Sequence, residues 1–523
     1  MTEARRFTGG RVFTGRRFVA ALLVEDGRVV VAGSEAEVAR SAPTGCAVED
    51  LHGHLVVPGL VDAHLHLAEM TRAEHGLPLD HLRSREDLVE RIRRWAEEHP
   101  SGPIVGRGWN VEALPGKREP TRVDLEKAVA DRPVILYHAS GHAAVANGAA
   151  LAAAGYSDRS PDPSGGRLGR GTDGTLNGLV YERALDPLGR LSSGAFPPEP
   201  AEIATTLRSI AAFGITTVGT LNTDPEELAV LASLGVAGEL PVRVRAYVRF
   251  SRLALVDVGR PLEVETDDRL AVRGTKAFTD GAFGPRTAWL SSPYADRPET
   301  SGDSTLTTRA LADVVRTTLA CGLVPALHAI GDRALGVALT SLEGIEPIPG
   351  SARIEHAALV PPELYPLLDR VRPTLVVQPG FVWSDAWLGE RLGPERARHA
   401  YPFRTLLERG HALVGSSDAP YDPVDPWRGL AAAVRRTDPA GGSANPDPGE
   451  TLSAEQAFQL YTAHAGPGLG EADLGSLEVG SRADLAVLDA LDLSRAISRG
   501  HLGVRSTWVG GKRTYDRTAR TGT

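Results

Sequence analysis

The chain has 523 residues, a formal net charge of −9 and two cysteines, Cys46 and Cys321. This length allows roughly two to four domains with a sizeable core. The acidic balance argues against a nucleic-acid surface, and two cysteines are too few for a disulfide framework or a zinc site made of thiolates. No stretch approaches the ~20 apolar residues of a membrane span, and the apolar run after Arg17 is followed by no cleavage site. We therefore expect a cytoplasmic protein without nucleic-acid or membrane partners.

Short strands separated by turns make up both ends of the chain. They are predicted at Arg11–Phe13, Ala20–Val24, Arg28–Ala32, Ala483–Leu488, Val504–Val509 and Lys512–Tyr515. Asp26-Gly27 and Gly510-Gly511 are typical of the tight turns between such strands. Because both ends carry strands and no helical pattern, we predict one small β domain built from residues 1–58 and 470–523.

Residues 59–469 alternate strands with helical patterns. The strands are predicted at Gly59–His66, Thr216–Leu221, Val242–Phe250, Val272–Thr279, Val324–Ala329, Arg353–Ala358, Thr374–Gln378 and Ala412–Ser416. Helices are predicted between them at Thr308–Ala320, Arg333–Leu342, Pro362–Val371 and Phe403–Arg409. Eight strands alternating with helices predict an α/β fold, a (β/α)8 TIM barrel.

The gap between the first and second predicted barrel strands is too long for an ordinary connection. It contains elements of its own: a helix at Asp87–His99, a strand at Pro133–His138 and a helix at Ala143–Ala153. We therefore predict an inserted α+β subdomain over roughly residues 70–205.

Two histidines stand out by their spacing. His64 and His66 end the run Gly59-Leu-Val-Asp-Ala-His-Leu-His. On a strand, this spacing points both imidazoles to the same face. At the carboxyl end of a barrel strand, that face is the opening where catalytic residues gather. A metal ion explains such a pair better than two histidines in a packed core.

Four more polar residues fall at or near the ends of later predicted strands: Lys276, His328, His356 and Asp418. A single histidine or aspartate there would fit a loop hydrogen bond or a cap. Together with the first pair, the set gives four imidazoles and a carboxylate aimed at one opening. Such ligands suit zinc, manganese, iron or nickel.

A lysine is unusual in this chain, because 53 of the 57 basic residues are arginine, and Lys276 therefore needs a separate explanation. A protonated amine cannot ligate a metal, whereas a lysine carbamylated by CO2 can bridge two cations. Arginine cannot replace it, because the guanidinium stays protonated. The alternative is a lysine with a buried stem that is ion-paired with Asp280. The residues alone leave both interpretations open.

The run Pro58-Gly-Leu-Val-Asp-Ala-His-Leu-His resembles the opening motif of the amidohydrolase superfamily. Further stretches are similar to its YtcJ-like branch, which includes N-substituted formamide deformylases. They are Lys276-Ala-Phe-Thr-Asp-Gly, His328-Ala-Ile-Gly-Asp-Arg-Ala, Arg353-Ile-Glu-His, Ser417-Asp-Ala-Pro and the tail from Gly475 to Leu488. The resemblance spans nearly the whole chain.

This resemblance implies a metal-bearing barrel, a β-sandwich from both termini and a small-molecule substrate. It implies one or two divalent ions, with zinc expected, and a CO2-derived carbamate on the lysine. The implied ligands are His64, His66, Lys276, His328, His356 and Asp418. The expected reaction is hydrolysis of a C–N amide bond, for example in an N-substituted formamide, by a metal-activated hydroxide with Asp418 as general base.

Two other functions stay open. A deaminase or a lactone- or ester-cleaving hydrolase uses the same barrel, although Lys276 weighs against a mononuclear deaminase. A non-catalytic metal-holding or scaffold relative is the second, and the presence of Asp418 weighs against it. The sequence names neither the substrate nor the oligomeric state, and a homo-oligomer stays open.

Two residues of the insertion are candidates for substrate binding. His142 lies in a Gly-His…Asn stretch that resembles one of the YtcJ-like branch, and it is expected to contact the scissile carbonyl or the leaving group. A cap or core role is the alternative. Trp109 is expected to wall the pocket, with a buried aromatic core residue as the alternative.

Overall fold

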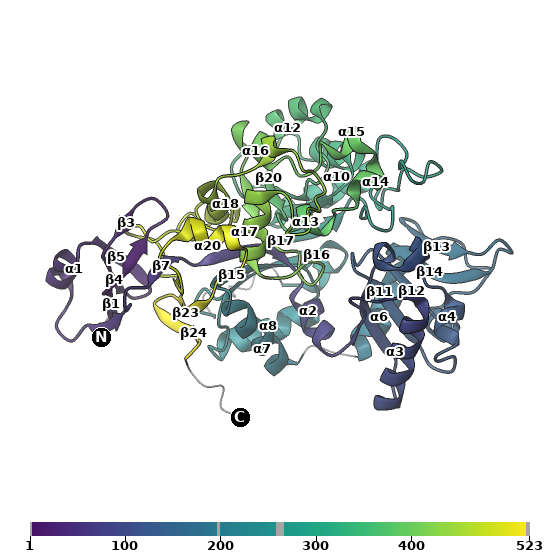
Figure 1. Ribbon diagram of the computed structural model, residues 1–523, viewed down its shortest axis with the longest axis horizontal. Helices are drawn as coiled ribbons and strands as arrows, with labels where there is room; N and C mark the ends of the chain where they lie inside the picture. The colour runs from purple at the N-terminus through teal and green to yellow at the C-terminus, as the bar shows by residue number, and fades with distance from the viewer. Residues whose placement is uncertain (1–2, 196–198, 258–265, 519–523) are drawn as a thin grey trace.

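Figure 1 shows the computed structural model of the protein, which describes residues 3–195, 199–257 and 266–518. Its central element is a sheet of eight parallel strands in the order β21-β20-β19-β18-β17-β16-β15-β8. They are β8 (Leu60–Leu65), β15 (Ile215–Thr223), β16 (Arg243–Arg249), β17 (Leu270–Phe278), β18 (Val324–Ala329), β19 (Arg353–His356), β20 (Thr374–Val377) and β21 (Leu413–Gly415). Each overlaps a predicted strand, so the (β/α)8 barrel is confirmed.

The first and last strands meet and nearly close the barrel. The Asp418 N–H donates to His64 O at 2.7 Å, and the His66 N–H donates to Ala419 O at 2.8 Å. Asp62 Oδ1 accepts from the Ser417 N–H at 3.0 Å and from the His64 N–H at 3.2 Å. The residues after β21 are therefore held against the end of β8 by backbone and side-chain hydrogen bonds.

Helices cover the outside of the barrel. They are α7 (Pro200–Ala211), α8 (Pro225–Val236), α10 (Thr308–Ala320), α11 (Asp332–Ser341), α12 (Tyr365–Val371), α16 (Phe403–Glu408) and α17 (Pro426–Arg435). Helix α10 illustrates why they form: the side chain of Thr307 caps its first turn, and its buried residues Leu311, Val314, Val315 and Thr318 recur at helical spacing. The four helices predicted around the barrel strands all overlap observed ones.

Short helices fill the remaining connections. They are α2 (Leu67–Glu74), α13 (Phe381–Ser384), α14 (Leu388–Leu392), α15 (Pro394–Ala397), α18 (Ala454–Leu460), α19 (Ala465–Gly468) and α20 (Leu493–Arg499). Of these, α2 follows β8 directly, and α13 and α14 follow β20. The connections after these two strands thus leave from the carboxyl end of the barrel, where active sites of this fold lie.

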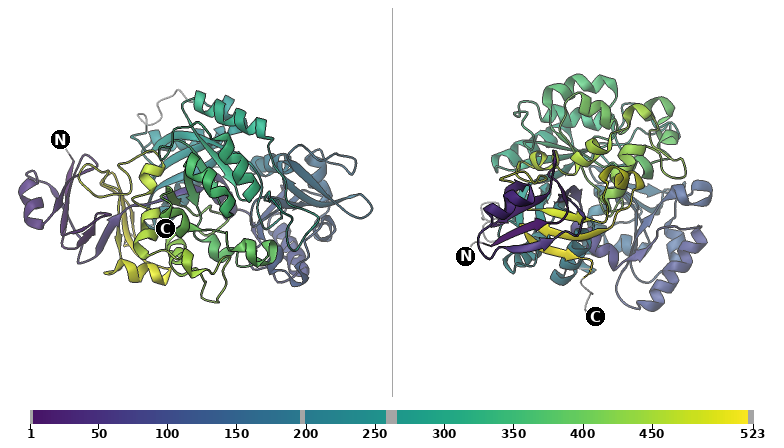
Figure 2. Two further views of the ribbon diagram at one scale, coloured as in Figure 1. Left: turned by 90° about the horizontal axis from the view of Figure 1, so that it is seen from above. Right: turned by 60° about the vertical axis from the view of Figure 1, so that its left-hand side comes forward.

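Both ends of the chain build a β-sandwich at one end of the molecule (Figures 1 and 2). One sheet has the order β5-β4-β1-β6 and the other β24-β23-β22-β7-β2-β3. The strands are β1 (Ala4–Thr8), β2 (Arg11–Phe13), β3 (Phe18–Val19), β4 (Ala21–Glu25), β5 (Arg28–Gly33), β6 (Ala47–Asp50), β7 (Leu55–Pro58), β22 (Leu485–Leu488), β23 (Val504–Val509) and β24 (Lys512–Asp516). The Phe7 and Trp508 rings pack edge to face between the sheets, with centroids 5.1 Å apart.

Buried ion pairs attach the barrel to the C-terminal part of the sandwich. Arg243 Nε lies 2.7 Å from Asp484 Oδ2, and Arg245 pairs with Glu471. Both arginines belong to β16, at the end of the barrel away from the strand carboxyl ends. Removing one partner of such a pair would leave an uncompensated buried charge, so these pairs fix the two parts in one arrangement.

The predicted insertion forms a six-stranded sheet of its own, in the order β13-β14-β12-β11-β10-β9. Figure 1 shows it at the end of the molecule opposite the sandwich. Its elements are β9 (Leu77–Pro78), α3 (Arg85–Glu98), β10 (Ile104–Trp109), α4 (Arg122–Glu126), β11 (Val134–His138), β12 (Ala143–Ala146), α5 (Gly148–Ala153), β13 (Gly166–Arg170), β14 (Leu176–Glu182) and α6 (Asp186–Ala195).

The helix predicted at Ala143–Ala153 is wrong in its first half. Residues Ala143–Ala146 are strand β12, which pairs with β11 and β14, and α5 begins only at Gly148. An alanine-rich run favours a helix by propensity, but here the two neighbouring strands supply ladder hydrogen bonds and override it. Asn147 marks the change, because its side chain caps α5.

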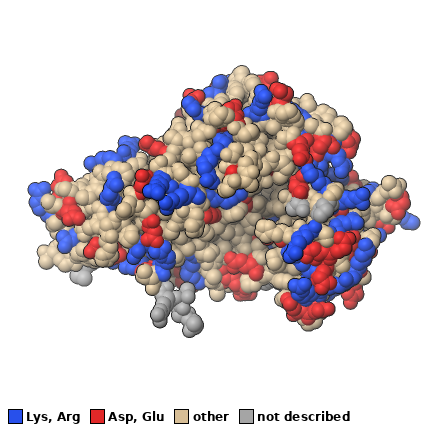
Figure 3. Space-filling model, in the orientation of Figure 1, with Lys and Arg blue, Asp and Glu red and all other residues tan. Residues whose placement is uncertain are grey.

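On the face shown in Figure 3, acidic and basic side chains are interspersed. Among the residues that the structure describes, no helix combines the length and the apolar character needed to cross a bilayer.

We predict that Asn147→Ala destabilises the insertion. The buried Asn147 amide accepts from the N–H groups of Val134 and Ala150 and donates to the carbonyls of Val129 and Arg132. Losing the cap and these bonds should cost about 2–4 kcal/mol of unfolding free energy. Hydrogen exchange of β11 and α5 measures the loss.

The matched control is Asn110→Ala, since the Asn110 side chain accepts from the Glu112 N–H at the start of a single 3-10 turn. That variant should lose about 1 kcal/mol or less. Equal protection in wild type and Asn147→Ala would contradict the structural role of Asn147.

Candidate metal site

All six predicted ligands lie at one end of the barrel. His64 is in β8 and His66 follows it, Lys276 is in β17, His328 is in β18, His356 ends β19, and Asp418 follows β21. Every one of these side chains is buried. The topology therefore gathers polar groups from five strands into the barrel opening, as the strand-end positions predict.

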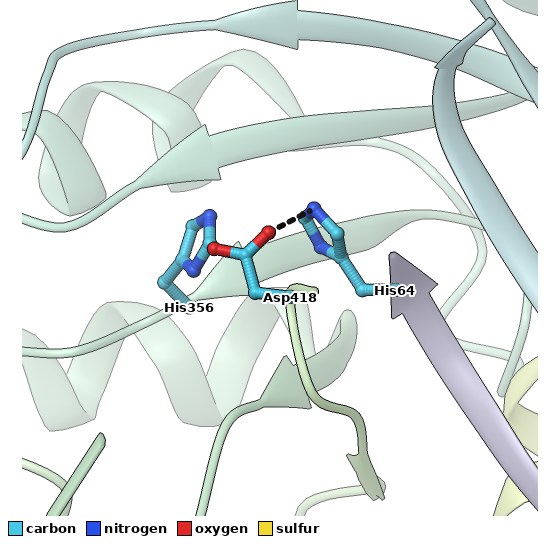
Figure 4. Close-up of side chains that lie close together, drawn as sticks. All are labelled: His64, His356 and Asp418. Carbon is cyan, nitrogen blue, oxygen red and sulfur yellow. Dashed lines mark ion pairs between the residues drawn. The ribbon is translucent and has the colours of Figure 1, made fainter. Parts of the chain in front are cut away.

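Three of them form a tight cluster: His64, His356 and Asp418 (Figure 4). One ligand atom from each lies within 4.8 Å of the others. Asp418 Oδ1 lies 3.2 Å from Nε2 of His64 and 3.2 Å from Nε2 of His66. Neither His64 Nε2 nor Asp418 Oδ1 has a hydrogen-bond partner, although both are buried.

The neighbours of His64 determine which ring nitrogen faces the cluster. Its Nδ1 lies 2.7 Å from Glu355 Oε2, so Nδ1 donates to this carboxylate and Nε2 faces the cluster. Arg353 donates to both oxygens of Glu355, at 2.8 and 3.0 Å, and to Ala63 O. Although burial alone would raise the pKa of Glu355, Arg353 and His64 hold it well below its usual range. Glu355 is thus a carboxylate that orients His64.

His356 is oriented in a similar way by a polar chain. Ser416 Oγ donates to Val377 O at 3.0 Å and accepts from Gln378 Nε2 at 2.9 Å. Gln378 Oε1 therefore faces His356 Nδ1, at 2.8 Å, and accepts its proton. Burial lowers the pKa of His356 to about 3, so the ring is neutral and Nε2 is left for the site.

His328 completes the histidine group with the opposite ring orientation. Its Nε2 lies 3.0 Å from Gly281 O, which leaves Nδ1 free, and its ring centroid lies 4.5 Å from that of His356. Burial lowers the pKa of His66 and holds the pKa of His328 well below its usual value. Neutral imidazoles are the form that binds metal ions.

Lys276 has no hydrogen-bond partner at Nζ and is 1% exposed. Asp280, the alternative partner, is occupied elsewhere: it accepts the N–H groups of Trp289, Ile330 and Gly331. Burial lowers the pKa of Lys276 to about 8. The ion pair between Lys276 and Asp280 is therefore not formed.

Two residues of the cluster adopt backbone conformations that L-residues rarely use. His356 has φ +75° and Asp418 has φ +61°. Such positions cost of order 1–3 kcal/mol and persist where the surroundings determine them, often at functional sites. Here hydrogen bonds to β8 hold Asp418, and Gln378 holds His356.

The donor atoms gathered in the barrel opening have the chemistry of a metal site. His64 Nε2 and Asp418 Oδ1 are two acceptors 3.2 Å apart, which repel each other unless a proton or a cation lies between them. Neutral imidazoles, a carboxylate and a second layer of carboxylate and amide groups are the usual surroundings of a divalent ion. The residues present therefore fit one.

The two predicted substrate residues lie in different surroundings. His142 reaches the opening, with its ring centroid 4.9 Å from that of His328. Trp109 is 1% exposed in the core of the insertion, and its indole N–H donates to Leu136 O at 2.8 Å. This packing matches the alternative of a buried core aromatic, and a pocket-wall role for Trp109 stays a prediction.

The residues that orient the proposed ligands were not predicted from the sequence. Glu355 was present in the quoted motif Arg353-Ile-Glu-His, where residues 353 and 355 share one strand face, but Gln378 and Ser416 carry no recognisable pattern. Tyr421 was missed as well: its ring packs 5.1 Å from His66, and its hydroxyl donates to Glu69, which also pairs with Arg107 of the insertion.

Comparison with known proteins supports this description. The family model described as "Amidohydrolase family" matches residues 47–515. YtcJ of Bacillus subtilis (strain 168) is 31% identical, over 97% of this chain and 99% of its own. N-substituted formamide deformylase of Arthrobacter pascens is 29% identical, over 95% of each chain. The crystal structure of an uncharacterized metal-dependent hydrolase from Pyrococcus horikoshii OT3 has a TM-score of 0.77 and 29% identity, over 95% of this chain and 99% of that one.

We predict that Glu355→Gln lowers the metal affinity of the folded chain. The variant loses the negative charge that orients His64, so the metal affinity should fall roughly 10–100-fold. Competition with a chelator of known affinity measures the change. The control is Glu343→Gln, which removes an exposed carboxylate paired with Arg370; equal affinities of the two variants would refute the role of Glu355.

Proposed function

The chain belongs to the amidohydrolase family, and on this premise we propose that it hydrolyses a C–N bond of a small amide. N-substituted formamides are the first substrates to test, because a relative that matches nearly the full chain is named for their deformylation. The observation that carries the proposal is the buried cluster of His64, His356 and Asp418, with bare acceptor atoms facing one another.

In this proposal six side chains hold one or two divalent ions, with zinc as the expected metal because it suits imidazole and carboxylate ligands. They are His64, His66, Lys276, His328, His356 and Asp418. When bound, such an ion polarises a carbonyl oxygen and lowers the pKa of a water molecule to about 7. The remaining tasks, which are proton transfer and orientation, fall to the chain's own residues.

Asp418 is the proposed general base and acid. Its Oδ1 is close to two imidazoles, and its backbone N–H is anchored to His64 O. Burial alone would raise its pKa, but His64 holds the pKa of the Asp418 carboxyl well below its usual range, so the carboxylate form is available. Asp418 takes a proton from the attacking water and delivers it to the departing nitrogen.

Lys276 is proposed to carry a carbamate. Its amine is buried without a hydrogen-bond partner, and a pKa of about 8 leaves a share of it unprotonated near neutral pH. The neutral amine forms an N–C bond to CO2 and releases one proton, which yields an anionic carboxylate in place of a cation. This change gives a buried group a charge that can face metal ions.

Turnover by metal-loaded and metal-depleted protein tests the function. We expect hydrolysis of secondary formamides or other amides, lost on depletion and restored by zinc. Asp418→Asn keeps an oxygen ligand but removes the base, so kcat should fall about 10²–10⁴-fold with a smaller change in KM. A panel with esters, lactones and an aminopurine separates the alternatives: cleavage of esters alone, or deamination alone, would contradict C–N amide hydrolysis.

The Lys276→Ala variant tests the carbamate. It should fold, hold less metal per chain and lose roughly 10–100-fold in turnover. Added formate, acetate or bicarbonate should restore part of the activity by filling the space. Lys117→Ala is the control, since Lys117 is half exposed and pairs with Glu112 and Glu390. Wild-type metal content in folded Lys276→Ala would remove Lys276 from the site.

A further inference from the structure

One loop of the insertion, residues 138–142, packs against the rim of the candidate metal site. Gly141 has φ +73°, and a Cβ there would lie 2.3 Å from Cε1 of Tyr421, whose ring packs on His66. The next residue, His142, packs its ring against those of His328 and Phe278. The loop therefore contacts Tyr421, which packs on the proposed ligand His66, and the proposed ligand His328 across the opening.

Within this loop, His142 is paired with Glu182 at the end of β14. The Glu182 N–H donates to His142 O at 3.2 Å, and His142 Nδ1 lies 2.9 Å from Glu182 Oε2. Because a carboxylate accepts the Nδ1 proton, Nε2 is the ring atom left to meet another molecule. The His142 side chain keeps 14% of its surface exposed, whereas His328 behind it is 1% exposed.

Glu182 has an unfavourable backbone conformation and an unpartnered carboxylate oxygen. Its backbone has φ +53° and ψ −129°, a region that L-residues rarely adopt. Its second oxygen, Oε1, is buried and has no hydrogen-bond partner. Strain and an unpartnered carboxylate oxygen in one residue indicate that its position serves something other than stability.

The Glu182 carboxylate packs against Gly281 of the barrel. A Cβ at Gly281 would lie 2.0 Å from Glu182 Oε1, so any side chain there would displace Glu182. The carbonyl of the same residue accepts from His328 Nε2. Gly281 therefore brings Glu182, His142 and His328 together.

We propose that Glu182 is a positioning residue that orients His142, so that His142 Nε2 contacts the substrate at the metal site. This inference rests on the proposed function and deepens it. His142 lies over β17 and β18, which the strand order puts across the barrel from the junction of β21 and β8, where Asp418 is held. A substrate in the opening then lies between Asp418 and His142, and the insertion supplies part of the active site.

Nitrogen NMR of 15N-histidine-labelled protein tests the pairing without any substrate. The His142 signals are assigned by their loss in His142→Ala. We expect a protonated Nδ1 in the wild type and a clear change of both ring nitrogens in Glu182→Gln. Asp124→Asn is the matched control, because it neutralises another buried carboxylate of the insertion that caps α4. Unchanged His142 signals in Glu182→Gln would overturn the proposal.

A double-mutant cycle tests whether Glu182 acts through His142. It uses any substrate of the panel that the metal-loaded enzyme turns over. Glu182→Gln should lower kcat/KM roughly 10–100-fold at unchanged metal content, and Glu182→Asp should recover part of the loss. In a His142→Ala background, Glu182→Gln should add no more than about 2-fold.

The outcomes separate this inference from the proposed function. Independent, multiplying effects of the two substitutions would show that Glu182 has only a structural role. If the two substitutions have coupled effects on the hydrolysis of an ester and no amide is cleaved, the positioning of His142 by Glu182 is supported and amide hydrolysis is refuted. The NMR experiment tests the hydrogen bond between Glu182 and His142 even if the enzyme turns over no substrate of the panel.

Discussion

Two acceptor atoms face each other at 3.2 Å in the barrel opening, Nε2 of His64 and Oδ1 of Asp418. Both are buried without hydrogen bonds, and an unsatisfied buried group costs roughly 1–3 kcal/mol. The imidazole cannot turn to relieve the contact, because Glu355 holds Nδ1 and is itself held by Arg353. A proton or a cation between the two atoms removes the repulsion, and the surrounding imidazoles and carboxylate suit a divalent metal ion.

The fold and the site depend on the same backbone. Hydrogen bonds between the residues after β21 and the end of β8 nearly close the barrel, and those residues carry Asp418 and His66. A shift in this junction would therefore disturb the closure and the ligands together. On the other side of the opening, the insertion contributes His142 over β18, while Tyr421 connects His66 to Glu69 and Arg107. The site is thus enclosed by segments that are distant in the sequence.

The sequence was most informative where a residue's role follows from local periodicity. Parallel barrel strands are buried runs with a polar residue at the carboxyl end, so the eight strands and the proposed ligands His328 and His356 could be located. A helix was predicted at Ala143–Ala146 because small residues fit a helix or a strand equally well. Pairing with the neighbouring strands β11 and β14 makes this segment a strand.

Residues that act through distant partners could not be predicted in this way. Glu182 is 40 positions from His142, and Gln378 is 22 from His356. Their roles come from strand pairing across the sheet, which no local pattern encodes. Gly281 is the last residue of the motif Lys276-Ala-Phe-Thr-Asp-Gly, yet its need to be glycine comes from the carboxylate of the insertion packed against it.

The central claim is that the strand-end residues hold divalent metal, and anomalous X-ray scattering from crystals of zinc-loaded protein tests it most directly. We expect one or two zinc peaks surrounded by His64, His66, His328, His356 and Asp418, with extra density beyond Nζ of Lys276. Fully loaded protein with zinc bound elsewhere, and with the His64 and Asp418 side chains still in direct contact, would contradict it.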